Sequence, residues 1–242
     1  MIHDESAFFD ALIDEQGEFD PFTERGWRKL SGAFVQLVDP RHAMSVLDVG
    51  CGTGASARIY ADVAAPYVGI DLSIRALSVA RRRLGPAAPL LLADACRMPF
   101  APESFDLVAF SSVLHHIGDF RVPLVEAMRI LKPGGHVFAF DPNALHPAMG
   151  LLRQPASPFY IAGGVSPNER PLHPAALRRA FAAAGLTGIR QRAVAGVQFR
   201  SVAPSLIDRL LPIYDVFDRL MEISGTGRWF GPFVVTTGRA PG

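Results

Sequence analysis

Apolar and polar positions follow two different spacings along the chain, and the change falls near residue 43. Before it, apolar residues recur three or four positions apart, which is typical of helices that cover an apolar surface. After it, short continuous apolar runs alternate with stretches of helical spacing. The runs lie at 45–49, 67–70, 89–93, 105–110 and 136–140.

Continuous apolar runs that alternate with helices indicate parallel strands covered on both faces. The helices are expected at 54–64, 73–84, 120–131 and 174–185, and two later strands near 187–198 and 230–238. The chain is therefore predicted to be an α/β protein with right-handed crossovers between its parallel strands.

A glycine-rich turn follows the first strand in the stretch "VLDVGCGTGASARIY", where Gly50, Gly52 and Gly54 precede a helix. Glycines permit positive φ and let backbone amides approach a ligand closely. Asp48 lies two residues earlier, and its carboxylate would repel a pyrophosphate but attract an ammonium group near a sulfonium. This combination predicts S-adenosylmethionine as the ligand, with its amino group paired to Asp48 directly or through water.

Two further acids end the second and third apolar runs. Asp71, in "VGIDLS", is placed to accept hydrogen bonds from both ribose hydroxyls, and Asp94, in "LLLADACRMPF", is suited to the adenine amino group. The fourth run continues into "SSVLHHIGD" beside the same site. The four features occur in the order that one nucleoside site at the sheet edge requires.

Composition excludes several classes of protein and of binding partner. The 242 residues, 49% of them hydrophobic, allow one sizeable core, and the net charge of +1 gives no long-range attraction to nucleic acid. No apolar run reaches the roughly 18 residues of a membrane-spanning helix, so stable membrane insertion is not expected. The two cysteines, Cys51 and Cys96, form no CxxC pair, and no metal site is expected. With an acidic N-terminal stretch unlike a signal peptide, this favours a reduced, cytoplasmic protein.

These motifs resemble those of the class I S-adenosylmethionine-dependent methyltransferases, especially the small-molecule branch with enzymes of the ubiquinone and menaquinone biosynthesis type. The resemblance covers about residues 44–142. It implies a Rossmann-like seven-stranded, mostly parallel sheet whose last strand is antiparallel. It also implies a set of cofactor-binding residues, namely Asp48, Gly50, Cys51, Gly52, Gly54, Asp71, Leu72, Asp94, Ala95 and Ser111.

Adjacent His115 and His116 follow the fourth strand, and neighbouring side chains on a helix diverge by about 100°. One is expected to be packed and hydrogen-bonded; in the resembling enzymes this is usually the second, which makes His115 the candidate catalytic base. His146 and Tyr160, in the Pro-rich stretch 142–172, are candidate substrate-binding residues.

We therefore expect methyl transfer to an O or C nucleophile of a small or lipid-like metabolite, with S-adenosylhomocysteine as the second product. Residues 1–42 would form a helical segment that caps the cofactor site. Residues 43–242 would form the methyltransferase domain, with insertions near 142–172 and 200–226 as a substrate lid. The stretch 202–223 contains more acids than arginines, which favours a lid or a homodimer surface over anionic lipid. A non-catalytic cofactor-binding partner subunit and an NAD-dependent oxidoreductase remain the alternatives.

Overall fold

A seven-stranded sheet runs through the computed structural model, which describes residues 2–17, 19–40, 42–162, 165–200 and 211–242. The strand order is β3-β2-β1-β4-β5-β7-β6, and β7 pairs antiparallel with both of its neighbours. The strands are β1 (Met44–Val49), β2 (Ala64–Asp71), β3 (Leu90–Leu92), β4 (Phe105–Ser111), β5 (Leu131–Pro142), β6 (Thr187–Val194) and β7 (Phe233–Arg239). The predicted sheet, with an antiparallel last strand, is confirmed.

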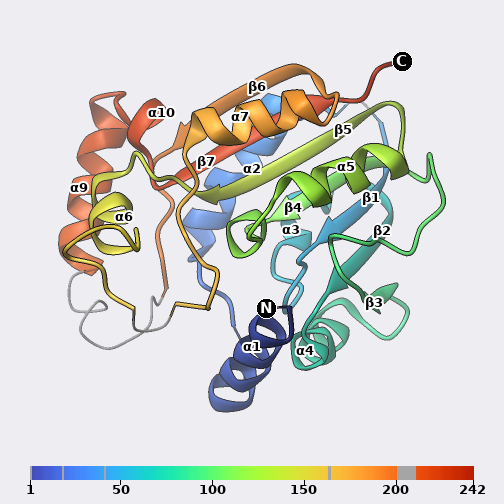
Figure 1. Cartoon of the computed structure of the whole chain (residues 1–242), viewed down its shortest axis with the longest axis horizontal. Helices are drawn as coiled ribbons and strands as arrows, with labels where there is room; N and C mark the ends of the chain where they lie inside the picture. Colours follow the sequence, from blue (N-terminus) through green and yellow to red (C-terminus); the bar gives the residue numbers. More distant parts are fainter. Residues whose placement is uncertain (1, 18, 41, 163–164, 201–210) are drawn as a thin grey trace.

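Helices cover both faces of this sheet (Figure 1). They are α1 (Ile2–Gln16), α2 (Glu24–Val38), α3 (Ala57–Tyr60), α4 (Ile74–Leu84), α5 (Arg121–Ile130), α6 (Pro147–Leu152), α7 (Pro174–Ala183), α9 (Leu211–Ile223) and α10 (Gly227–Phe230), with a 3₁₀ turn at Leu114–His116. Helices α5 and α7 pack into one core cluster and α2 into the other.

Successive residues of the central strands point to opposite clusters, as the period of two in a strand requires. In β4, Leu107 joins the α2 side while Val108 joins the side of α5 and α7. In β5, Val137 and Phe138 divide in the same way. Burial on both faces explains why these strands appear in the sequence as continuous apolar runs.

The helix expected at 54–64 is mostly absent, because only Ala57–Tyr60 is helical. Gly54 has φ +79°, which an α-helix cannot contain, and β2 already begins at Ala64. The helical period expected over 202–223 is present as α9 from Leu211 onward, and residues 201–210 lie outside the described part of the chain.

The parallel strands end at one edge of the sheet, and their ends bring the candidate residues together. The loop after β1 contains Gly50, β2 ends at Asp71, β4 ends at Ser111, and Asp141 lies near the end of β5. Helix α1 packs on α4, beside the same edge.

Candidate functional site

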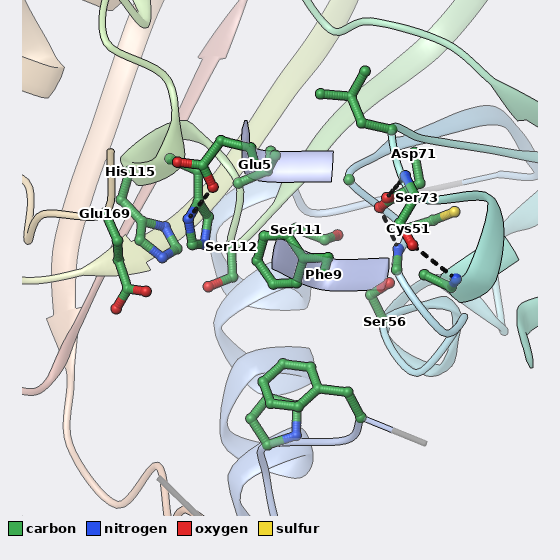
Figure 2. A pocket seen from close by; sticks show the side chains of 18 of the residues that line it. Glu5, Phe9, Cys51, Ser56, Asp71, Ser73, Ser111, Ser112, His115 and Glu169 are labelled. Carbon is green, nitrogen blue, oxygen red and sulfur yellow. Dashed lines mark hydrogen bonds and ion pairs between the residues drawn. The ribbon is translucent and has the colours of Figure 1, made fainter. Parts of the chain in front are cut away.

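A cavity of about 730 Å³ lies at the carboxyl ends of the parallel strands. This volume is within the range of roughly 300–1,000 Å³ that is usual for small-molecule sites. Figure 2 shows two groups of side chains on opposite sides of it, with Phe9 and Ser111 between them. One group contains Cys51, Ser56, Asp71 and Ser73, and the other contains Glu5, His115 and Glu169.

The glycine loop forms one wall of the cavity. Gly50 and Gly52 have φ +70° and +52°, in the left-handed region that favours glycine. A Cβ on Gly50 would lie 2.6 Å from the Cβ of Val113, whereas one on Gly52 would meet no atom within 4 Å. Gly54 lies behind the loop against Leu84 of α4 and is not a lining residue.

The loop amides do not point at the ligand space as the sequence analysis expected. Gly50 and Cys51 donate to the carbonyl of Ile70 at 2.9 and 3.0 Å, and Gly54 donates to Cys51. The Gly52 N–H donates to Asp71 Oδ2 at 2.8 Å. The N–H groups of Gly50, Cys51 and Gly52 are therefore used by the end of β2, and that of Gly54 within the loop, so none of these four donors is free for a ligand.

Asp71 lines the cavity and braces the loop at the same time. Its Oδ1 accepts from the Ser73 N–H at 2.8 Å, and its Oδ2 accepts from Gly52. Burial raises the pKa of Asp71, and these backbone donors oppose the rise. Each oxygen has a second lone pair with which it can accept from a ligand hydroxyl.

Asp48 is fully buried between strands β2 and β4, opposite Gly69 and Ala109. Its carboxyl group accepts from Ser56 Oγ at 2.6 Å, from Tyr67 OH at 2.8 Å and from Ser111 Oγ. Burial raises the pKa of Asp48 to about 6, although the three hydroxyls lower it. Asp48 does not line the cavity, but Ser56 and Ser111 do, so a ligand would meet these hydroxyls first.

Most of the other candidate cofactor residues line the cavity. Asp94 does so while its Oδ1 accepts from the Cys96 N–H at 2.8 Å, and Leu72, Ala95 and Cys51 also line it. Burial, with Asp71 and Asp48 nearby, raises the pKa of the Cys51 thiol well above its usual value. This thiol is therefore a packed side chain and not an activated nucleophile.

His115 lines the cavity and contacts a buried acid that the sequence analysis missed. Its Nδ1 lies 2.9 Å from Asp141 Oδ1, which also accepts from the His115 backbone N–H at 3.1 Å. Asp141 is fully buried, and its Oδ2 has no hydrogen-bond partner in the described structure. Burial raises the pKa of Asp141, and its contact with His115 opposes the rise. The signal was present in the sequence, because Asp141 ends an apolar run as Asp71 does.

His116 has the packed, hydrogen-bonded role expected for one of the pair. Its Nδ1 lies 2.7 Å from Ser166 Oγ, and its ring meets Phe9 of α1 edge-on at 5.2 Å. Burial lowers the pKa of His116. Glu5, also from α1, accepts from the Asn168 N–H at 2.7 Å. Helix α1 is thus tied to the segment after residue 165 on this side of the cavity, which sequence patterns did not indicate.

The two candidate substrate residues lie outside the lining of the cavity. His146 is fully buried at the N-terminus of α6, where its Nδ1 accepts from the Met149 N–H at 3.3 Å. Burial lowers the pKa of His146 to about 4. Tyr160 does not line the cavity either. The same segment contributes Met149 and Arg153 to the lining instead.

The described residues contain neither a metal-binding cluster nor a membrane-spanning helix. No group of three or more His, Cys, Asp or Glu side chains in those residues is placed to hold a metal ion. Within the same residues, none of the helices combines the length and apolar character that crossing a membrane requires.

Comparisons with known proteins agree with this geometry. A family model of a methyltransferase domain matches residues 47–139. Demethylmenaquinone methyltransferase of Renibacterium salmoninarum is 36% identical over 129 residues, which are 53% of this chain and 52% of that protein. Ubiquinone biosynthesis O-methyltransferase of Thiobacillus denitrificans is 38% identical over 129 residues, 52% and 55% of the two chains. The chain therefore spans about half the length of the curated relatives it matches.

The fold comparison extends over nearly the whole chain. A chain from the complex between the Haloferax volcanii Trm112 methyltransferase activator and a methyltransferase superposes with a TM-score of 0.69 at 22% identity, covering 98% of each chain. That identity shows the fold alone. Residues 47–139 therefore match a methyltransferase domain, and the chain as a whole shares the fold of the superposed chain.

Proposed function

We propose that this protein transfers a methyl group from S-adenosylmethionine to an O or C nucleophile of a small or lipid-like metabolite. One observation supports this most strongly: a single cavity contains both the glycine wall with Asp71 and the paired His115. A nucleoside cofactor and a second reactant can therefore share one cavity.

The residues at the ends of β1 to β4 fit this cofactor. Asp71 offers two carboxylate oxygens for the ribose hydroxyls, and Gly52 leaves the space open where a side chain would stand. Ser56 and Ser111 stand between the cavity and Asp48, and through them the buried carboxyl can respond to a ligand ammonium group. When bound, the cofactor supplies a sulfonium methyl group that a nucleophile takes by in-line displacement.

The remaining lining is rich in apolar side chains, which suits a lipid-like metabolite and excludes water from the reactants. These side chains come from α1, from the segment between α1 and α2, from α6, and from a strand end and a loop: Phe8, Phe9, Leu12, Phe19, Met149, Phe140 and Phe199. We propose that residues 1–42 cap the cofactor, because α1 supplies part of this lining. The stretches 142–172 and 200–226 would act as a lid on the substrate side.

His115 is proposed as the base that takes a proton from a hydroxyl or an acidic carbon. A carboxylate accepts from Nδ1–H, so contact with Asp141 leaves the lone pair on Nε2 for this purpose. Asp141 acts as a positioning residue, since it touches the imidazole and not the cavity. The names of the relatives point to quinone biosynthesis, which supports a ring hydroxyl or ring carbon as the nucleophile.

The test is incubation of the protein with methyl-labelled S-adenosylmethionine and separate lipid, small-metabolite and RNA extracts. We expect label in the lipid or small-metabolite fraction, and loss of that label in an Asp71→Ala variant. Label in RNA would refute the proposed substrate class. Tight cofactor binding without any labelled product would favour the non-catalytic alternative.

A further inference from the structure

Helix α9 presents a stripe of apolar side chains to solvent. Its members recur three or four positions apart, so they lie on one face of the helix. This α9 stripe consists of Ile213, Val216, Phe217, Leu220 and Ile223, whose exposed fractions range from 40% for Phe217 to 75% for Ile223. Exposed apolar patches of this kind mark interaction surfaces more often than isolated surface residues do.

The acids of α9 point away from this stripe. Asp218 is only 1% exposed, and its Oδ2 accepts from the Gly196 N–H at 2.6 Å. Glu222 pairs with Arg25 at 2.8 Å and with Lys29, both on α2. Asp215 is half-buried. The described acids of the stretch that favoured a lid or dimer surface over anionic lipid therefore lie on the inner side of the helix and not on the exposed one.

Cations and aromatic rings are exposed on α9 and on α10, which packs against α9. Arg219 of α9 is exposed, and α10 adds the exposed Arg228, Trp229 and Phe230. The Arg228 guanidinium lies 3.8 Å from the centre of the Trp229 ring. Apolar residues with Trp and Arg at their border are typical of helices that lie in the interface of a bilayer.

The stripe also borders the segment that lines the cavity. Figure 1 shows α6 beside α9, and the His146 ring at the start of α6 lies 6.1 Å from the ring of Phe217. Within this segment Leu151 is exposed, whereas Met149 and Arg153 line the cavity. The stripe therefore lies next to a helix that contributes Met149 to the lining of the cavity.

We propose that the α9 stripe, with Trp229 and Phe230, docks on a lipid bilayer that contains anionic headgroups. The apolar side chains enter the interface, and Arg219 and Arg228 meet the headgroups. This inference goes beyond the proposed function. It rests on that function only for the benefit that docking would bring, which is access to a lipid-like substrate. Binding to lipid itself requires neither cofactor nor methyl transfer.

The test uses Trp229 as a natural reporter. The chain has two tryptophans, and Trp27 is only 4% exposed while Trp229 is 52% exposed. The protein, without cofactor, is mixed with phosphatidylcholine vesicles that contain or lack phosphatidylglycerol. With phosphatidylglycerol we expect a blue shift of the fluorescence and co-flotation of the protein. In Trp229→Phe the shift should disappear.

Paired variants separate this surface from apolar exposure in general. Val216→Glu combined with Leu220→Glu should weaken vesicle binding about tenfold or more, because two carboxylates would enter the interface. Val125→Glu is the matched control, since Val125 of α5 is 57% exposed and lies outside the stripe. Its binding should equal that of the unchanged protein.

Several outcomes would overturn the proposal. If the unchanged protein does not float with the vesicles at all, or if the double variant floats to the same extent as the unchanged protein, docking through the stripe is refuted. A dimer that dissociates in the double variant, without any vesicle binding, would assign the stripe to a second copy of the chain. Equal binding to vesicles without phosphatidylglycerol would remove the headgroup role of Arg219 and Arg228. None of these results depends on whether the protein transfers methyl groups.

Discussion

The Nδ1 atom of His115 lies 2.9 Å from the Oδ1 atom of Asp141, between the ends of two neighbouring parallel strands. Both side chains are buried, and only His115 reaches the cavity. A buried carboxylate in this place fixes which ring nitrogen carries the proton and how the ring is turned.

Replacing either member of this pair should reduce turnover while leaving cofactor affinity intact. For His115→Gln we expect kcat to fall about 10² to 10⁴-fold, the usual contribution of general base catalysis. Asp141→Asn should also lower kcat and should displace the pH profile of kcat, because an amide holds the ring without a charge. Cofactor affinity is measured by calorimetry and kcat by transfer of labelled methyl.

His136→Gln is the control for that experiment. His136 is the first residue of β5 that pairs with β7 and lines a separate cavity at the opposite edge of the sheet, so its loss should leave kcat and the pH profile unchanged. A His115→Gln variant with normal kcat would show that the reaction needs no base at this position.

Asp71→Ala should weaken binding of S-adenosylhomocysteine by about 1–3 kcal/mol, roughly 5- to 150-fold, through loss of charged hydrogen bonds to the ribose. The variant also removes the acceptor of the Gly52 N–H, which acts in the same direction. Asp62→Ala removes an exposed acid as the control. Equal calorimetric affinities for the two variants would place the ribose elsewhere.

Alanine at Gly50 and at Gly52 should have different consequences. At Gly50 the new Cβ would meet Val113 at 2.6 Å, in addition to the cost of about 1–2 kcal/mol for a left-handed residue, so the free energy of unfolding should fall most there. At Gly52 no atom lies within 4 Å, so the main loss should be in cofactor affinity. Urea unfolding and calorimetry on both variants measure this contrast, and a reversed order would contradict the loop geometry.

The raised pKa of Asp48 predicts a specific dependence of stability on pH. The folded value of about 6 exceeds the ordinary value of 3.8, so folding favours the protonated carboxyl group. Its contribution is complete below about pH 4 and is lost as pH rises to about 6, at a cost of about 3 kcal/mol. Urea unfolding of Asp48→Asn and the unchanged protein should therefore diverge over this range, and parallel curves would mean that Asp48 does not titrate there.

Much of the fold could be predicted from the sequence because its strands are buried on both faces. The runs 105–110 and 136–140 are continuous and apolar for that reason, and they became β4 and β5. The ends of the helix expected at 54–64 could not be predicted from the apolar pattern, because apolar spacing does not reveal that Gly54 takes a positive φ. Strand ends were therefore more predictable than the turn that leaves the first of them.

The position of a candidate residue was predictable where that residue ends a strand, as Asp71 does, or soon follows one, as His115 does. It was not predictable where partners come from distant parts of the chain. Ser56, Tyr67 and Ser111 meet at Asp48 only after three strands are aligned, and this converts an acid expected near the ligand into a buried one. The hydrogen bond from the Asn168 N–H to Glu5 was not predictable for the same reason, because the two residues are far apart in the sequence.

The inward direction of the acids on α9 was within reach of the sequence. Asp218 and Glu222 are four positions apart and share a face, whereas Val216 and Leu220 occupy another. A charge count over the whole stretch does not separate the acidic face of α9 from its apolar face, whereas the helical period does.

The most direct measurement of the central claim is calorimetric titration of the protein with S-adenosylhomocysteine and, separately, with NADH. Asp71, the glycine wall and the buried Asp48 predict saturable one-to-one binding of the nucleoside and no binding of the pyrophosphate. Binding of NADH with no heat from S-adenosylhomocysteine would contradict the account.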